Sequence, residues 1–315
     1  MKLLLVGTPE VALPTFEALA ASDHQVVAVL TRTPAARGRS RKLLPSPVGQ
    51  WAQEQGLEVI EADSLREPAI AERVRQTGAQ LAVVVAYGAL IPQSLLEAFE
   101  YGWINLHFSQ LPRWRGAAPV QRALEAGDTQ IATSVFQIEA GLDTGPVFDM
   151  RTYPIDEDVN AGELLAFLAQ EGASQVVEVV NQIAAGTAVA QPQPANGITV
   201  APKLGREEMA IDPHASAATI HNFVRARAPQ PTAVAFYQGQ RVKIFETKIY
   251  RGQLDVALEA GQLHATKREL LMGTGDGILQ ICTLAPAGKS RMEAAAWARG
   301  ARLDASTPYF TGIPE

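Results

Sequence analysis

The sequence is almost free of cysteine, with Cys282 as the one thiol in 315 residues. A single thiol cannot form a disulfide within its own chain, and no CxxC pair or Cys/His cluster of the kind that binds zinc occurs. A disulfide-stapled secreted domain and a zinc finger are therefore excluded. One unpaired thiol fits the reducing environment of the cytoplasm.

Long hydrophobic runs are also missing. The longest, residues 81–87, is far shorter than the roughly 18 to 20 residues that a membrane-spanning helix needs. The apolar start, residues 1–6, is too short for the core of a signal peptide. With 47% hydrophobic and 19% charged residues, the chain has the composition of a folded globular protein, and we expect it in the cytoplasm.

Glycine-rich phosphate loops are the third absence. Gly7 ends a short apolar run, but the second and third glycines of GxGxxG do not follow it, and GxxxxGK[ST] does not occur. This argues against a nicotinamide or ATP site. No HExxH pair and no GxSxG turn is present either, so the sequence offers no zinc protease or serine hydrolase motif.

Strand-like and helix-like runs alternate over the first 110 residues. The pattern predicts strands at 2–6, 25–30, 59–61, 81–86 and 103–106, with helices at 11–20, 48–55, 67–76 and 93–99. Further strands at 133–138 and 147–155 and a long helix at 161–185 follow. Alternation at this pitch is typical of the α/β class, in which a doubly wound, mostly parallel sheet carries helices on both faces.

The composition changes after residue 186. Residues 187–205 are rich in proline and glycine and show little periodicity, which is typical of a linker. A helix at 215–226 and short strands at 234–237, 242–250, 269–273 and 278–284 then predict a small β-barrel or sandwich. We therefore expect a first domain over 1–186, a linker over 187–205 and a second domain over 206–315.

Charge is unevenly distributed. The chain carries a net charge of −6, yet residues 203–315 hold 14 Lys and Arg against 11 Asp and Glu. The densest basic cluster lies in the first domain and consists of Arg32, Arg37, Arg39, Arg41 and Lys42, with no acidic residue between them. Because phosphate contacts depend on local clusters, this segment is either a nucleic-acid-binding loop or a solvated surface loop.

One polar trio could carry chemistry. Asn105 and His107 are two residues apart at the end of a predicted strand, so their side chains share one face of the sheet. An amide can donate to an oxyanion, and an imidazole carries protons near neutral pH. Asp143 stands between two glycines in Gly-Leu-Asp-Thr-Gly and could orient the imidazole. The same residues also fit a structural polar pair and an ordinary turn acid.

The segments around this trio resemble the folate-dependent formyltransferases. The strongest likeness is the run NLHFSQLPRWRGAAPVQ from Asn105 to Gln121, together with GLDTG at 141–145. Other matching segments are residues 6–10, 44–48, 84–88, 286–292 and 298–302. The likeness extends over nearly the whole chain. It implies a doubly wound formyltransferase domain, a linker and an OB-like β-barrel that binds tRNA.

The resemblance also implies an activity and a site. The family members with this second domain and basic loop transfer a formyl group from 10-formyltetrahydrofolate to the α-amine of methionine on initiator tRNA. The family's catalytic residues correspond to Asn105, His107 and Asp143. Its folate-binding run corresponds to Ser109, Gln110, Leu111 and Pro112, although Phe108 and Gln110 stand where the family pattern has Gly and Leu. Its tRNA-binding loop corresponds to Arg37, Arg39, Arg41 and Lys42.

Three other functions share parts of this pattern. The trio also suits formyl transfer to a small amine, such as an amino sugar nucleotide or a glycinamide ribonucleotide, and suits a folate-linked hydrolase that releases formate. A non-catalytic RNA-binding relative would keep the fold alone. We expect a monomer that needs no metal, because formyl transfer requires only oxyanion and proton handling.

Overall fold

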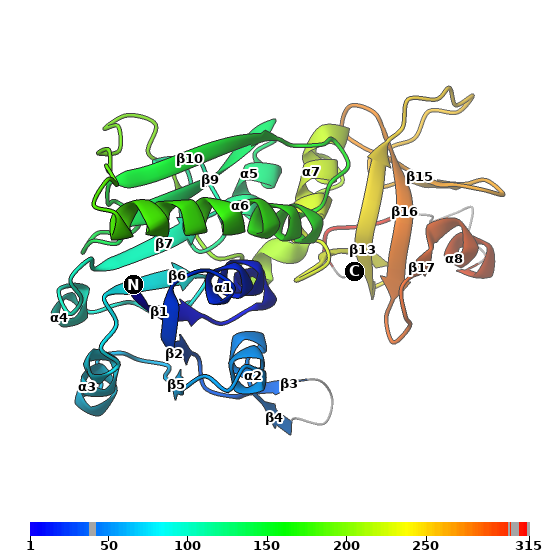
Figure 1. Cartoon of the computed structure of the whole chain (residues 1–315). Helices are drawn as coiled ribbons and strands as arrows, with labels where there is room; N and C mark the ends of the chain where they lie inside the picture. Colours follow the sequence, from blue (N-terminus) through cyan, green and yellow to red (C-terminus); the bar gives the residue numbers. More distant parts are fainter. Residues whose placement is uncertain (38–41, 302, 304–308, 314–315) are drawn as a thin grey trace. The chain divides into compact units, whose positions relative to one another are not determined.

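The computed structural model describes residues 1–37, 42–301, 303 and 309–313. It divides into two compact units (Figure 1). Unit 1 comprises residues 1–119, 131–153 and 165–202, and unit 2 comprises residues 120–130, 154–164 and 203–315. Within the described part of the chain, no helix is both long and apolar enough to cross a membrane.

Unit 1 is built on a seven-stranded sheet with the strand order β10-β9-β7-β6-β1-β2-β5. Its strands are β1 (Lys2–Gly7), β2 (Gln25–Thr31), β5 (Val59–Glu61), β6 (Leu81–Val85), β7 (Trp103–His107), β9 (Gln130–Gln137) and β10 (Val147–Pro154). The pairs from β7 through β6, β1 and β2 to β5 are parallel, whereas β9 runs antiparallel to β7. The expected mostly parallel sheet is thus confirmed.

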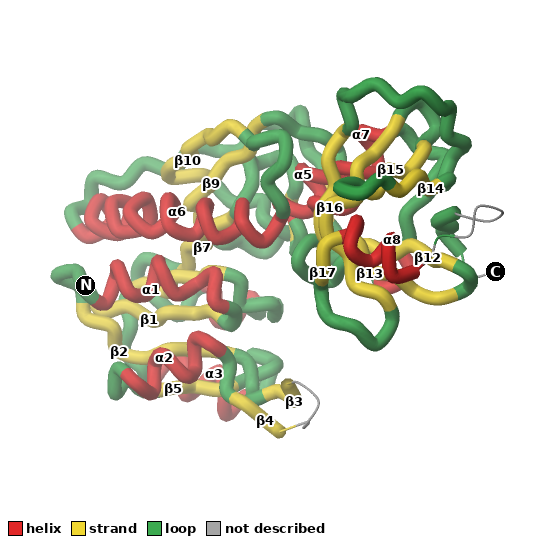
Figure 2. The backbone as a smooth tube through the Cα atoms, turned by 90° about the vertical axis from the view of Figure 1, so that its right-hand side faces the viewer, coloured by secondary structure: helices red, strands yellow, loops and turns green. Residues whose placement is uncertain are grey.

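Helices cover both faces of this sheet, as its buried strands require. In β1, Leu4 and Val6 share a core with α3, whereas Leu3 and Leu5 point the other way and are equally buried. Helices α6, α1 and α2 follow one another along the sheet in both views (Figures 1 and 2). The helices are α1 (Leu13–Ala20), α2 (Pro47–Glu54), α3 (Pro68–Gln76), α4 (Gln93–Leu96) and α6 (Ala161–Ala184), with a 3-10 turn, η1 (Glu10–Ala12), before α1.

The proline-rich stretch after α6 is ordered within unit 1. Gln191 bridges Val147 at the start of β10, and β11 (Val200–Ala201) pairs in parallel with β8 (Arg115–Gly116). The predicted linker over 187–205 therefore includes residues 187–202, which belong to unit 1. Lack of periodicity correctly indicated irregular backbone there, but it carried no information about what that backbone contacts.

Unit 2 contains an antiparallel sheet with the strand order β12-β13-β16-β15-β14, and β17 pairs with β16. The elements are α5 (Pro119–Glu125), which begins at the border of unit 1, η2 (Arg206–Met209), α7 (Ala217–Arg227), β12 (Ala233–Tyr237), β13 (Gln240–Ile249), β14 (Leu263–Ala265), β15 (Leu270–Gly273), β16 (Ile278–Pro286), β17 (Met292–Glu293) and α8 (Ala294–Ala301). The predicted fold class is confirmed for this unit as well.

A C-terminal segment, residues 309–311, joins the two edges of this sheet. Thr311 forms an antiparallel bridge with Phe236 of β12, and Tyr309 forms one with Gln262 beside β14. Phe310, between them, is 1% exposed and stacks on Trp297 of α8 with ring centroids 5.7 Å apart. This segment therefore bridges residues at both edges of the sheet.

A buried arginine anchors α7 in unit 2. Arg227 is fully buried, and its guanidinium donates to Glu125 at 2.7 Å and to the Glu208 carbonyl at 2.8 Å. The same guanidinium lies 3.4 Å from the centroid of the Phe223 ring. Burial lowers the pKa of Arg227, and the neighbouring Glu125 opposes that effect. The charge is thus compensated by one carboxylate and by two backbone carbonyls, those of Glu208 and Phe223.

Replacing Arg227 tests this anchor. Arg227→Ala leaves Glu125 without its buried partner and opens a cavity beside Phe223, so we expect the free energy of unfolding of unit 2 to fall by about 3 kcal/mol. Urea denaturation followed by circular dichroism measures this change. Arg241→Ala on β13 is the matched control, because Arg241 is exposed. Equal stability of the two variants would contradict the assignment.

Candidate active site

The third strand from the β10 edge of the sheet carries the polar pair. Asn105 and His107 alternate with Leu106 along β7, and Leu106 lies against Gly172 of α6. The pair therefore occupies the opposite face, on which Trp103 packs with α3 and α4. Asn105 is paired with Val84 near the carboxyl end of β6, so the site lies at the carboxyl edge of the parallel strands, where α/β folds bind ligands.

The imidazole of His107 is held by a backbone carbonyl. Its Nε2 atom lies 2.9 Å from the carbonyl oxygen of Trp114, which can only accept a hydrogen bond. The hydrogen of the neutral ring is therefore on Nε2, and Nδ1 keeps its lone pair. The ring of Phe136 on β9 meets the imidazole edge-on at 6.2 Å. His107 is 6% exposed, so these contacts fix both its tautomer and its orientation.

Asp143 faces the other ring nitrogen. Its Oδ2 atom lies 3.9 Å from Nδ1 of His107 and accepts a hydrogen bond of 2.7 Å from the Gly116 backbone amide. The separation from Nδ1 is too long for a hydrogen bond, so the carboxyl acts on the imidazole through its charge. The structure therefore brings together two of the predicted residues, but the bond that orients the ring comes from Trp114.

Asp143 takes a backbone conformation that its flanking glycines make possible. Its φ angle is +50°, in the left-handed region that Asp tolerates better than most residues. A Cβ atom on Gly145 would lie 1.8 Å from the Gln137 carbonyl oxygen, so only glycine fits at the end of this turn. The Gly-Leu-Asp-Thr-Gly sequence thus lets the turn approach β9 closely enough to aim its carboxyl at His107.

The side-chain amide of Asn105 is available to a ligand. Asn105 is half-buried, and within the described residues its side chain makes no hydrogen bond. A half-buried amide without a protein partner retains both of its N–H donors for a bound oxygen atom. Because it shares a sheet face with His107, the two side chains can address the same reacting group.

The predicted folate-binding run forms the turn after β7. Ser109 is fully buried, donates to the Arg113 carbonyl at 2.6 Å and accepts from Ser134 through its own carbonyl oxygen. Leu111 and Pro112 are also buried, whereas the side chain of Gln110 is exposed. Ser109, Leu111 and Pro112 are therefore buried within the turn, and Gln110 is the predicted residue whose side chain is exposed to solvent.

The predicted basic loop is flanked by two short antiparallel strands, here called the hairpin. Its strands are β3 (Ala35–Arg37) and β4 (Lys42–Leu44), and Arg37 pairs in register with Lys42, whose side chain is exposed. Arg39 and Arg41 lie outside the described residues. Arg32 precedes the hairpin and donates to Asp63 at 2.6 Å. Hydrogen bonds from Thr33 and Arg32 hold the pKa of Asp63 below its usual value, so Arg32 is engaged within unit 1.

Sequence reasoning missed the groups that support the trio. Gln193, from the predicted linker, contacts the Asp143 turn and Arg115. The Trp114 carbonyl and the Gly116 amide are backbone atoms, for which side-chain identity gives no signal. Gly116 itself stood in the matching run, and its φ angle of +125° is one that only glycine readily adopts.

Known protein families match both the first and the last part of the chain. The family model described as formyl transferase matches residues 1–180, and the model of the formyl transferase C-terminal domain matches residues 203–302. The methionyl-tRNA formyltransferase of Thermobifida fusca is 44% identical over 304 residues, covering 96% of this chain and 97% of that protein. The methionyl-tRNA formyltransferase of Cutibacterium acnes is 44% identical over 313 residues, covering 98% and 99%.

Solved structures share the fold at much lower identity. WlaRD, a sugar 3N-formyl transferase, superposes with a TM-score of 0.68 at 14% identity and covers 92% of this chain and 99% of its own. The methionyl-tRNA formyltransferase from Clostridium thermocellum gives a TM-score of 0.55 at 16% identity, with 80% and 95% covered. At these identities the likeness establishes the architecture alone.

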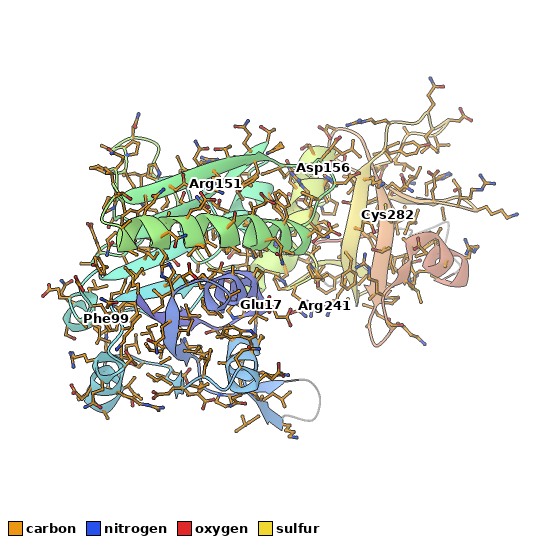
Figure 3. All side chains as sticks on the ribbon, viewed as in Figure 1. Glu17, Phe99, Arg151, Asp156, Arg241 and Cys282 are labelled. Atoms are coloured by element: carbon orange, nitrogen blue, oxygen red, sulfur yellow. The ribbon has the colours of Figure 1, made fainter. Side chains whose placement is uncertain are left out.

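The single thiol, Cys282, is on β16 of unit 2 (Figure 3). Burial, reinforced by the negative charge of Glu246, raises the pKa of Cys282 from 9.0 to about 12. The thiol therefore stays protonated at neutral pH and is a poor nucleophile. Among the residues that the structure describes, no group of three or more His, Cys, Asp or Glu side chains is arranged to hold a metal ion.

The raised pKa predicts slow alkylation of Cys282. At pH 8, a pKa of about 12 instead of 9.0 lowers the thiolate fraction several hundred-fold. We expect iodoacetamide to modify the folded protein at least ~100-fold more slowly than the urea-unfolded chain, as followed by intact mass. The unfolded chain serves as the control for reagent activity. Rapid labelling of the folded protein would contradict the protected state of the thiol.

Proposed function

The chain belongs to the formyl transferase family, among the methionyl-tRNA formyltransferases, and we propose that it transfers the formyl group of 10-formyltetrahydrofolate to the α-amine of methionine on initiator tRNA. The observation that carries this proposal is the unpartnered Asn105 amide beside the fixed imidazole of His107, in a chain that matches these enzymes over nearly its whole length. The reaction would take place in the cytoplasm, where initiator tRNA is charged, and we propose a monomer.

Asn105 supplies the donor for the developing oxyanion. As the methionyl nitrogen bonds to the formyl carbon, the formyl oxygen gains negative charge, and the Asn105 amide donates a hydrogen bond to it. The donor is positioned before the reaction by β7, so no reorganisation is needed at the moment of attack. Groups of this kind lower the barrier because they bind the charge that appears only in the transition state.

His107 moves the proton. It accepts the proton of the attacking amine at Nδ1, directly or through water, because Nε2 already donates to the Trp114 carbonyl. The resulting imidazolium donates from Nε2 to that carbonyl, and the Asp143 carboxyl lies 3.9 Å from its Nδ1. The proton then passes to the departing folate nitrogen as its bond to the formyl carbon breaks. Charge and atoms balance without a further reactant.

The folate donor fits beside the turn after β7. 10-formyltetrahydrofolate supplies the activated formyl group, and the run from Ser109 to Pro112 would hold it next to Asn105. Gln110 is the side chain of this run that faces outward, so it would contact the folate through its amide, while the buried Ser109, Leu111 and Pro112 shape the turn. A polar contact here replaces the apolar one of the family pattern.

The hairpin β3–β4 and unit 2 would bind the tRNA. We propose that the basic residues Arg37, Arg39, Arg41 and Lys42 contact phosphates near the acceptor end of the tRNA. These contacts would bring the methionyl amine to Asn105 and His107. The match of unit 2 to the formyl transferase C-terminal domain supports this acceptor over a small amine. WlaRD acts on a sugar, but at 14% identity its likeness to this chain concerns the fold alone.

A direct assay tests the reaction, and single substitutions test the trio. The purified chain with 10-formyltetrahydrofolate and charged initiator tRNA should yield formylmethionyl-tRNA, with elongator and uncharged tRNA as controls. We expect Asn105→Ala to lower kcat about 10²–10³-fold and His107→Ala or Asp143→Ala about 10²–10⁴-fold. The exposed Asp23→Ala and the half-exposed His24→Ala, in the turn before β2 of unit 1, are matched controls.

Each alternative function has its own result in that assay. Formate release without an acceptor would identify a hydrolase, and transfer to an amino sugar nucleotide would identify a small-amine enzyme. Full turnover by all three trio variants would overturn the assignment of the site, and no product with charged initiator tRNA would overturn the proposed function.

The hairpin is tested through salt dependence. Replacing its four basic residues by alanine removes up to four phosphate contacts, so the slope of log Kd against log salt should fall by roughly three units. Fluorescence titrations of tRNA over a series of potassium chloride concentrations measure this slope. Arg73→Ala/Arg75→Ala on α3 is the control, because both arginines are paired within unit 1, with Glu58 and Glu72. An unchanged slope would remove the hairpin from the tRNA interface.

A further inference from the structure

Residues 191–201, here called the strap, are attached to the active site from two sides. At one end Gln191 exchanges two backbone hydrogen bonds of 2.8 Å with Val147, two residues after the Asp143 turn. At the other end Thr199 accepts from the Trp114 amide through its hydroxyl at 2.9 Å, and β11 pairs with β8. The strap therefore spans the two loops that supply the partners of His107.

Gln193 is the side chain of the strap that reaches between these loops. Its Nε2 atom donates at 2.8 Å to the carbonyl oxygen of Asp143 and at 2.8 Å to that of Gly145. These two bonds use both amide hydrogens and fix the backbone of the turn on either side of Thr144. The turn holds Asp143 at a positive φ angle, so it needs outside contacts to keep that conformation.

The other end of the same amide holds the second loop. The Oε1 atom of Gln193 accepts from Nη2 of Arg115 at 2.6 Å and from its Nε at 3.1 Å. Arg115 lies between Trp114, whose carbonyl orients the imidazole, and Gly116, whose amide binds the Asp143 carboxyl. One side-chain amide thus connects the loop whose carbonyl accepts from Nε2 of His107 with the turn whose carboxyl faces Nδ1.

We propose that Gln193 is a positioning residue of the active site, which holds the Asp143 turn and the Trp114–Gly116 loop at the spacing that the His107 ring requires. The inference rests on the proposed function for its assay. Gln193 does not touch the reacting atoms in this role. It acts through Asp143 and Arg115, and its effect therefore belongs to the rate of the chemical step rather than to the binding of either substrate.

The chemistry of the contacts requires an amide. Two carbonyl oxygens need two N–H donors, and the Arg115 guanidinium needs an acceptor, a set that only Gln or Asn carries on one neutral group. Glutamate at this position would still accept from Arg115 but would turn a carboxylate oxygen towards two carbonyls. Gln193→Glu therefore removes the bonds to the turn with almost no change in side-chain volume.

The test compares Gln193→Ala and Gln193→Glu with Gln191→Ala and Gln191→Glu. Gln191 is the same residue type in the same strap, and its side chain is exposed. Since a displacement of about 1 Å at a catalytic group costs up to ~10²-fold in rate, we expect both Gln193 variants to lose 10- to 100-fold in kcat. We expect their KM values for folate and tRNA to stay within threefold of the parent, and the Gln191 variants to match the parent.

A double-mutant cycle separates positioning from stability. If Gln193 acts through Asp143, then Gln193→Ala should cost less than threefold in kcat when Asp143 is already alanine. A loss of stability alone would lower the melting temperature and the active fraction in both backgrounds equally. If Gln193→Ala does not fold, the isosteric Gln193→Glu answers the same question in the Asp143→Ala background.

The outcomes distinguish this inference from the proposed function. Normal kcat in the Gln193 variants would overturn the positioning role. Equal losses with and without Asp143 would overturn the part of that role that acts through the Asp143 turn. Either result would leave the formyl transfer intact. A parent enzyme that forms no formylmethionyl-tRNA would overturn the proposed function itself, and the role of Gln193 in it as well. If Gln193→Ala lowers kcat only when Asp143 is present, the result would support the positioning role and the proposed formyl transfer together.

Discussion

The site depends on a difference in hydrogen bonding between the two ring nitrogens of His107. Nε2 of His107 donates to the Trp114 carbonyl at 2.9 Å, which leaves Nδ1 as the basic atom, facing the Asp143 carboxyl at 3.9 Å. Were both nitrogens to donate to carboxylates or carbonyls, the ring would already carry both protons and could not accept another. The surrounding loops, the glycines of the Asp143 turn and the strap all serve to maintain this asymmetry.

How far the sequence predicted this arrangement depends on the distance along the chain between the groups involved. Asn105 and His107 could be placed on one face because alternation along a strand is a local property. The α/β class followed from strand and helix periodicity. Asp143 was joined to the pair because a carboxylate between two glycines could orient an imidazole, and the resemblance to formyltransferases names the same three residues. The mostly parallel sheet and its helix-covered faces then agreed with the prediction, because buried parallel strands are apolar throughout.

What the sequence did not predict are contacts between distant segments without periodicity. Gln193 lies in a proline-rich stretch whose composition indicates only irregular structure, and its partners are about 50 and 80 residues away. The pattern of side chains does not predict where the Trp114 carbonyl points, because that depends on the backbone conformation, in which Trp114 has a φ angle of +62°. Arg32 looked like part of a free basic cluster, but its partner Asp63 is distant in sequence.

The joining of β12 to β14 by residues 309–311 has a consequence for biosynthesis. A chain that has emerged from the ribosome only as far as α8 lacks the bridges that Thr311 and Tyr309 make with Phe236 and Gln262, and the place of Phe310 beside Trp297 is open. Strand edges left unpaired recruit other strands. Unit 2 therefore gains these bridges only after residues 309–311 have been synthesised, when the residues that form the sheet of unit 1 are already available to fold.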